Sequence, residues 1–129
     1  LTGDHFYAHI KTTDFTGTMF EQQVAHGYFI MSIAAGLFVE GYEKNPVLLN
    51  YGIDELRFTK PVYPGAEVHI RFTCKEKLPN DKRVIEKPED FKRGDDIDKG
   101  IVKWLVEFFD ASNEITGVAT ILTMVARKP

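Results

Sequence analysis

The sequence has almost no cysteine: Cys74 is the only one in 129 residues. A single cysteine cannot form a disulfide bond within the chain, and it offers no cysteine framework for a structural metal. Both points favour a reducing compartment. We therefore expect a cytoplasmic protein.

Long hydrophobic runs and an excess of basic residues are also missing. The most apolar stretch, GYFIMSIAAGLFV at residues 27–39, is shorter than the ~20 residues that a helix needs to cross a bilayer. Lysine and arginine number 16 against 19 aspartate and glutamate residues, so the formal net charge is −3 and no broad positive field results. We expect neither nucleic-acid nor membrane partners.

Length and composition suit one domain. With 129 residues, 43% of them hydrophobic, the chain can form a single core but is too short for two ordinary domains. It begins with Leu1 rather than methionine and reaches its most polar motif within a few residues. We therefore expect residues 1–129 to be a fragment or the C-terminal domain of a longer chain.

Hydrophobic patterning predicts one helix, followed by strands. Residues 27–39 carry no charge, which is typical of a helix buried on most of its faces. Residues 15–27 predict a short surface helix or an irregular segment, and residues 47–62 predict a strand that a proline ends. Residues 67–75 alternate strictly between apolar and polar. One face of this strand would carry Val68, Ile70, Phe72 and Cys74.

The rest of the chain predicts a charged loop and a hairpin. Residues 75–100 are dense in lysine, glutamate and aspartate and predict an exposed loop, with a little ordered structure around Val84 and Ile85. Residues 101–126 predict two strands joined by a turn at DASNE. A mainly antiparallel sheet curled around the apolar helix would cover every apolar face. This α+β architecture is known as the hot-dog fold.

Polar residues gather at the start of the chain, in GDHFYAHI at residues 3–10. An irregular turn can bring the Asp4 carboxylate and the His9 imidazole to bear on one water, as general acid-base chemistry requires. The alternative is structural: Asp4 caps a turn, and His9 is a partly buried polar residue. His5 could line the same pocket, but nothing assigns it a task.

His26 and Gly27 stand directly before the apolar helix. A helix start offers unpaired backbone N–H groups and the positive end of the helix dipole, so the Gly27 amide could polarise a carbonyl oxygen. Alternatively, the glycine serves a tight entry turn. A zinc site formed by Asp4, His9 and His26 has no HxxxH or CxxC pairing to support it, so we expect no metal. The alternation around His69 makes it an ordinary surface histidine.

Three motifs resemble a known family. GDHFYAH resembles the active-site signature of the MaoC-like, or (R)-specific, enoyl-CoA hydratases, in which Gly-Asp is followed by a histidine five positions after the aspartate. VAHGYF resembles the His-Gly that opens the family's helix, and LRFTKPVYPG resembles its strand and turn. The resemblance covers nearly the whole chain. It implies the hot-dog fold and the addition of water to an α,β-unsaturated CoA thioester.

The resemblance also implies residue roles. Asp4 would be the general base on water, His9 would position that water and handle the proton, and the Gly27 amide would hold the thioester oxygen. The substrate-binding residues would be His26, Tyr28 and Phe6. No metal or redox cofactor is implied, because hydration needs neither. Lys60, Arg57 and the basic residues of 75–100 are candidates for the CoA phosphates.

A finer similarity involves NYGIDELRFTKPVYPG, FTCKEK and ILTMVAR. Together with the first motifs they are similar to the hydratase domain of the bifunctional phenylacetate-degradation proteins, which opens the ring of oxepin-CoA behind an aldehyde dehydrogenase domain. The similarity implies that substrate and that upstream domain. The alternatives are a hot-dog acyl-CoA thioesterase, which generally wants a helix carboxylate that residues 27–39 lack, and a non-catalytic module that binds acyl-CoA or supports an assembly.

Two departures from the family pattern stand out. Many of these hydratases have a serine eight positions after the helix-opening glycine, where this chain has Ala35, with Ser32 a turn earlier. The family's first strand is absent or truncated. We expect a homodimer or higher homo-oligomer, because domains of this type usually dimerise and unpaired sheet edges favour pairing.

Overall fold

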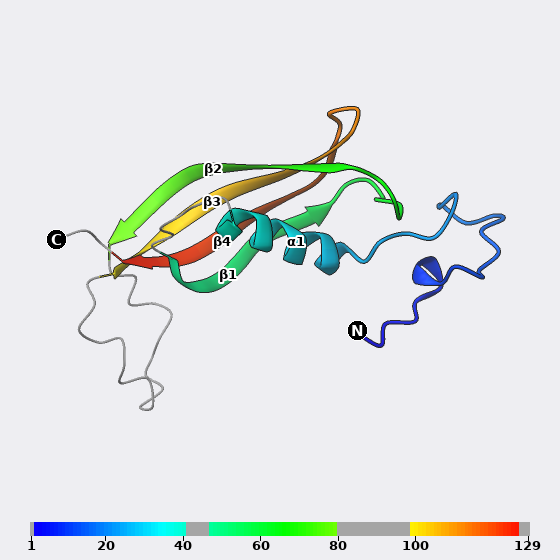
Figure 1. Ribbon diagram of the computed structural model, residues 1–129, viewed down its shortest axis with the longest axis horizontal. Coiled ribbons are helices and arrows are strands. Elements are labelled where there is room, and N and C mark those ends of the chain that lie inside the picture. Colours follow the sequence, from blue (N-terminus) through cyan, green and yellow to red (C-terminus); the bar gives the residue numbers. More distant parts are fainter. Residues whose placement is uncertain (1, 41–46, 80–98, 127–129) are drawn as a thin grey trace.

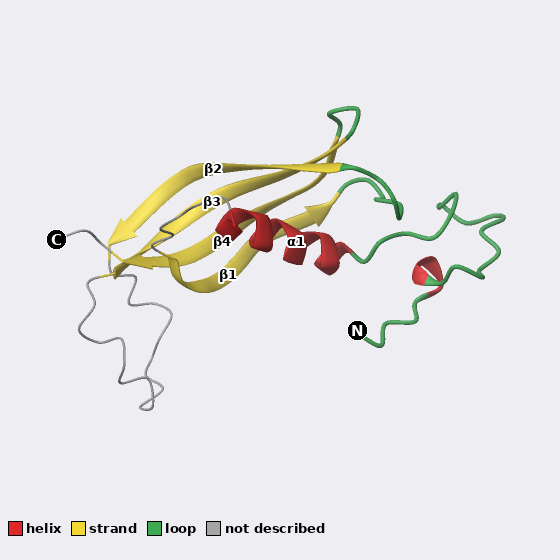
Figure 2. Cartoon of the chain, in the orientation of Figure 1, coloured by secondary structure: helices red, strands yellow, loops and turns green. Residues whose placement is uncertain are grey.

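The computed structural model describes residues 2–40, 47–79 and 99–126. A short 3₁₀ turn comes first, and one helix and four strands follow (Figures 1 and 2). Their bounds are η1 Tyr7–His9, α1 Gly27–Glu40, β1 Val47–Phe58, β2 Val68–Pro79, β3 Lys99–Asp110 and β4 Ile115–Ala126.

The four strands form one antiparallel sheet in the order β1-β4-β3-β2, so β1 and β2 are its edges. The sheet curves, and α1 lies across one of its faces (Figure 1). The predicted α+β class and the antiparallel sheet around the apolar helix are confirmed. In the part of the chain that is described, no helix is both long and apolar enough to cross a membrane.

The core lies between α1 and the two central strands. Three residues on one side of the helix, Ile30, Met31 and Ala34, point to the sheet. Alternate residues of β3 and β4 meet them. Ala34 and Val106 are fully buried, because they stand at the centre of this contact. The core cluster consists of Ile30, Met31, Ala34, Val106, Phe108, Ala119 and Ile121.

The helix is buried on one face only, so the prediction of burial on most faces is wrong for the single chain. Tyr28 is 76% exposed, Phe29 54%, Leu37 49% and Val39 53%. A helix that lies on one sheet buries only the side turned to that sheet; of these four side chains, Tyr28 still meets the Phe58 ring edge-on at 6.3 Å. These four side chains leave an apolar face open, which we call the outer helix face.

Strand β2 runs further than predicted. Residues 75–79 belong to it, and residues 76–79 pair with residues 100–103 of β3, so the charged loop predicted from residue 75 begins too early. The reason is that β2 is an edge strand: its backbone bonds to β3 while its charged side chains face solvent, and Glu76 forms an ion pair with Lys103 (3.1 Å). Val84 and Ile85 lie outside the described residues.

The predicted β3–β4 hairpin is confirmed, and Asp110 organises its turn. One oxygen of Asp110, Oδ1, accepts hydrogen bonds from the N–H groups of Ser112 (2.8 Å) and Glu114 (3.0 Å). Asn113 takes a positive φ of 60°, a conformation that asparagine tolerates in turns.

Residues 2–26 form an irregular segment that leaves the end of the sheet and folds back upon itself (Figures 1 and 2). Between residues 15 and 26 it is irregular rather than helical, which is one of the two predicted alternatives. Two hydrogen bonds tie it to the loop after β1: Ala25 N–H donates to the Val62 carbonyl (2.8 Å), and Glu21 N–H donates to the Tyr63 hydroxyl (3.4 Å). This segment carries the candidate acid-base residues.

Candidate active site

Asp4 closes the turn foreseen as its structural role, and its carboxylate also lies beside two imidazoles. Its Oδ1 accepts a hydrogen bond from the Phe6 N–H at 3.0 Å, which closes a small turn of the kind that aspartate favours. Its Oδ2 lies 3.8 Å from His9 Nε2 and 3.7 Å from His26 Nε2. One oxygen therefore holds the turn, while the other faces two imidazoles.

His9 is fixed from behind. Its Nδ1 lies 2.7 Å from the Val24 carbonyl oxygen. A carbonyl can only accept, so Nδ1 carries a proton, and in the neutral ring Nε2 has a free lone pair on the side of Asp4. The backbone around it is held as well, because Gln23 Nε2 donates to the His9 carbonyl (2.8 Å) and Val24 N–H donates to the Ala8 carbonyl (2.7 Å).

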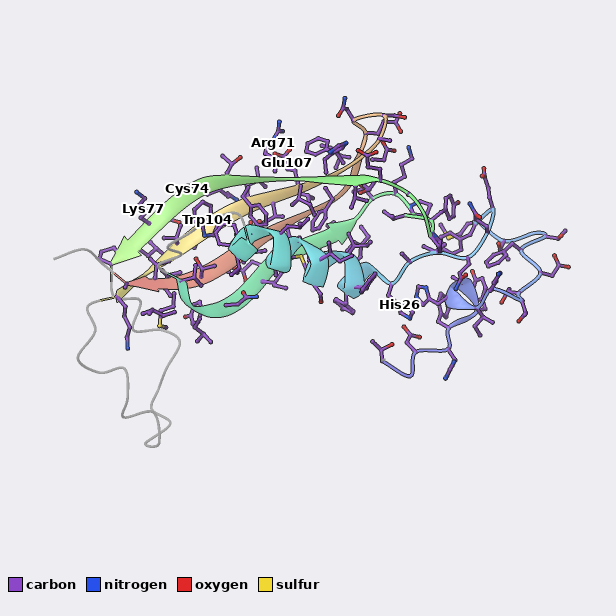
Figure 3. All side chains as sticks on the ribbon, viewed as in Figure 1. His26, Arg71, Cys74, Lys77, Trp104 and Glu107 are labelled. Carbon is purple, nitrogen blue, oxygen red and sulfur yellow. The ribbon has the colours of Figure 1, made fainter. Side chains whose placement is uncertain are left out.

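The fold brings His26 against this pair. Its ring stacks on the His9 ring, with centroids 3.8 Å apart and planes 25° apart. Figure 3 shows His26 just before α1, turned towards the N-terminal segment. The stack joins residues that are far apart in sequence, because the irregular segment folds back on itself before the helix begins.

Asp4, His9 and His26 offer three ligand atoms within 4.8 Å of one another, which invites a test for a metal site. A zinc ion binds in the plane of each imidazole, along the nitrogen lone pair, at about 2.1 Å. Two stacked rings whose planes differ by only 25° direct these lone pairs side by side instead of towards one point. The arrangement suits proton chemistry on a shared water better than metal binding.

Gly27 opens α1 as predicted, but the need for glycine is one of space. A Cβ atom at this position would lie 2.4 to 2.7 Å from three atoms of the Phe58 ring. Its φ is not among the positive glycine φ angles of the described residues, so the alternative of a conformational requirement is wrong. Within the described chain no acceptor is bonded to the Gly27 N–H, so this amide is free to bind a ligand oxygen.

The remaining candidates fall into two groups. Phe6 contacts the His9 ring edge-on at 5.8 Å and so flanks the cluster, whereas Tyr28 meets Phe58 edge-on at 6.3 Å; both side chains are exposed. His5 is exposed, and no contact gives it a role. The exposed His69, 3.4 Å from Glu67, is a surface residue as predicted.

Lys60, a candidate for binding the CoA phosphates, is engaged instead by two carboxylates of the chain. Its Nζ contacts Glu114 Oε2 and lies 3.1 Å from Asp110 Oδ2. These two hydrogen bonds raise the pKa of Lys60 above its usual value, and the bond that Lys60 donates to Glu114 has the larger effect. Arg57 is exposed and donates to its neighbour's carbonyl at Leu56 (2.8 Å). Lys60 therefore fastens the loop after β1 to the hairpin turn.

Ser32 does not replace the family serine. Its hydroxyl donates to the Tyr28 carbonyl one turn back (2.9 Å), a bond within the helix. Ala35 instead lines a small apolar pocket of about 70 Å³ between the second half of α1 and the sheet. Three aromatic rings, Phe38, Phe72 and Trp104, form much of its wall.

Sequence reasoning missed two contributors. Phe58 covers the helix start, and the Val24 carbonyl sets the proton position of His9. Every residue has a carbonyl group, so Val24 carries no sequence signal for this role. The aromatic residue of LRFTKPVYPG was visible, but its contact with Gly27 depends on how β1 lies beside α1.

The geometry can be compared with known proteins. Residues 1–93 match the family model described as a MaoC like domain. Protein MaoC from Klebsiella aerogenes is 47% identical over 86 residues, which are 67% of this chain and 25% of that protein. The chain thus spans about a quarter of the length of this curated relative.

Solved structures agree on the fold. A protein described as a monoamine oxidase regulatory protein from Archaeoglobus fulgius superposes with a TM-score of 0.75 at 22% identity, covering 96% of this chain and 74% of that one. R-hydratase PhaJ1 from Pseudomonas aeruginosa gives 0.69 at 18% identity, over 98% and 68%. A Mycobacterium tuberculosis protein described as a double hot-dog fold gives 0.68 at 16%, over 95% and 34%. The predicted hot-dog fold is confirmed.

Proposed function

The chain belongs to the MaoC-like domain family, and from this premise we propose that it adds water to the double bond of an α,β-unsaturated CoA thioester, as an (R)-specific enoyl-CoA hydratase does. One observation carries the proposal: Asp4 Oδ2 faces His9 Nε2 across 3.8 Å, and both are connected through His26 to the free amide of Gly27. His26, which contacts both acid-base groups, is thus the chain neighbour of an oxyanion donor.

The gap between Asp4 and His9 suits a water molecule. At 3.8 Å the two atoms are too far apart for a direct hydrogen bond, but one water could bond to both at about 2.8 Å in a bent arrangement. As the water oxygen attacks the β-carbon of the thioester, its proton passes to Asp4. The α-carbon then receives that proton from Asp4, relayed through Nε2 of His9, which also positions the water, so the carboxylate and the neutral imidazole are both restored.

The Gly27 amide supports the other end of the reaction. Attack at the β-carbon moves an electron pair towards the thioester oxygen, which becomes enolate-like. A backbone N–H at a helix start opposes that charge, and donors of this kind typically contribute ~3 kcal/mol. No metal or redox step is needed, because the bonds formed and broken require only proton transfers.

Oxepin-CoA is the substrate that we propose within this class. The similarity of NYGIDELRFTKPVYPG, FTCKEK and ILTMVAR to the oxepin-CoA-opening domains is what favours it. Water addition would be followed by cleavage of the ring C–O bond to give an aldehyde. An aldehyde dehydrogenase domain on the same full-length chain, which the similarity implies, would then consume that product.

The experiment mixes the purified chain with crotonyl-CoA and, separately, with oxepin-CoA. Loss of the conjugated-thioester absorbance without release of free thiol is expected, and the faster substrate distinguishes the two reactions. Thiol release would instead indicate a thioesterase. The helix argues against that outcome, because its first carboxylate is Glu40, at the opposite end from Gly27. No change in either signal would favour a binding module.

A second copy of the chain is the partner that we propose for the outer helix face. Its four side chains, Tyr28, Phe29, Leu37 and Val39, are apolar and about half exposed or more. An open apolar face of this kind favours association. Sedimentation velocity is expected to give a dimer, and Leu37→Glu is expected to shift it to a monomer.

A further inference from the structure

His26 contacts both members of the acid-base pair at once. Its ring lies flat on the His9 ring, at a centroid distance of 3.8 Å. Its Nε2 lies 3.7 Å from Asp4 Oδ2 and 3.4 Å from the Asp4 backbone oxygen. The side chain is one-third exposed.

The two oxygens near His26 determine where its proton lies. The backbone oxygen and an ionised carboxylate oxygen can only accept hydrogen bonds, so a favourable contact requires a proton on His26 Nε2. His9 has the opposite arrangement, because the Val24 carbonyl holds the proton on Nδ1. The two stacked histidines therefore both present Nε2 to the same carboxylate, but in different protonation states: an N–H donor from His26 and a lone pair from His9.

We propose that His26 is a positioning residue, which holds the His9 ring by stacking and directs an N–H at Asp4. The N–H favours the ionised carboxylate, and the stack prevents the His9 ring from turning away from it. Both effects preserve Oδ2 of Asp4 and Nε2 of His9 as two acceptors on one water. The catalytic consequence rests on the proposed hydratase function, whereas the arrangement of protons does not.

Three substitutions separate the stack from the donor. His26→Phe keeps an aromatic ring and removes the N–H, His26→Gln keeps an N–H donor and removes the ring, and His26→Ala removes both. With crotonyl-CoA, His26→Phe and His26→Gln are each expected to lose kcat by about tenfold or more at unchanged KM, and His26→Ala to lose more than either. His69→Phe is the matched control at an exposed histidine and is expected to retain wild-type kcat.

Ring ¹⁵N NMR tests the proposal independently of activity. In alkaline buffer, where free imidazoles are neutral, the wild-type chain is expected to show His26 protonated at Nε2 and His9 at Nδ1. In His26→Ala, the His9 ring is expected to become more mobile and its signals to broaden, while the Val24 carbonyl keeps the proton on Nδ1.

The outcomes are distinguishable. If the wild-type chain hydrates no thioester but shows the two tautomers, the proposed function fails and the positioning role stands. If the wild-type chain is active and His26→Ala keeps its kcat, the positioning role is wrong. The role is also wrong, with or without activity, if wild-type His26 carries its proton on Nδ1. Thermal unfolding shows whether each variant is folded. If His26→Ala is not folded, the His26→Phe and His26→Gln variants test the positioning role.

Discussion

Gly27 and Phe58 provide a quantitative test of how the helix start is packed. An alanine Cβ at position 27 would lie 2.4 Å from the nearest ring carbon, whereas ordinary contact begins at 3.4 Å, so the ring would have to move by about 1 Å. Overpacking of this size typically costs 1–3 kcal/mol, and we expect Gly27→Ala to lower the free energy of unfolding by about 2 kcal/mol. The displaced helix start should also weaken hydration.

The cost should disappear when the ring is removed. Phe58 is 46% exposed, so Phe58→Ala alone is expected to cost about 2 kcal/mol, roughly half of the loss for a fully buried phenylalanine. In the double variant the alanine at 27 meets no ring, and its added cost should be near zero. The two changes are therefore expected to couple by about 2 kcal/mol in the favourable direction.

Urea unfolding of the four chains of this cycle provides the measurement. Gly36→Ala is the matched control, because Gly36 lies in the same helix and a Cβ there meets nothing within 4 Å. It is expected to stabilise the chain by up to about 1 kcal/mol, since alanine favours the helix. Additivity within about 0.5 kcal/mol, or a Gly27→Ala chain as stable as the wild type, would refute the reasoning.

Three further predictions concern the site, the core and the turn. Asp4→Asn keeps the oxygen that accepts the Phe6 N–H but removes the base, so kcat should fall at least about 100-fold. Calorimetry should show unchanged thioester binding, and a wild-type rate would contradict the role of Asp4 as the base. Thr123→Val deprives the Trp104 N–H of its acceptor at 2.9 Å and should cost about 1–3 kcal/mol, followed by tryptophan fluorescence in urea. The pKa of Asp110 is lowered chiefly by the hydrogen bond from the Glu114 N–H and, after it, by Lys60. The ionised Asp110 therefore stabilises the fold above the usual carboxyl pKa, and this stabilisation is lost as the pH falls below about 4. The difference in Tm between wild type and Asp110→Asn should therefore shrink in acid, and a difference independent of pH would count against this.

Much of the fold could be predicted because strand periodicity is local. The alternation from Val68 to Phe72 determines which side chains face the helix, and the structure agrees; Cys74, by contrast, is exposed beside the register shift in the middle of β2. The burial of the helix could not be predicted in the same way. An apolar sequence shows that Tyr28 and Leu37 tolerate burial, but it does not show whether the covering surface comes from the same chain or from another molecule.

The proximity of Asp4 and His9 could be predicted, but the assembly of the residues around them could not. Asp4 and His9 lie close in sequence, so a turn suffices to bring them together, and spacing is informative. His26 reaches them only because the intervening segment folds back, and Phe58 reaches Gly27 only because of the position of β1. Contacts of this kind depend on tertiary structure, which no local pattern in a single sequence encodes.

Hydration in ¹⁸O-labelled water tests the central claim most directly. The chain is incubated with crotonyl-CoA, and the products are analysed by mass spectrometry, with Asp4→Asn as the matched control. The proposed function predicts an intact CoA thioester that has gained one labelled water, formed by the wild type and not by the variant. Label found in a free carboxylic acid, or a thioester product formed equally by both chains, would contradict it.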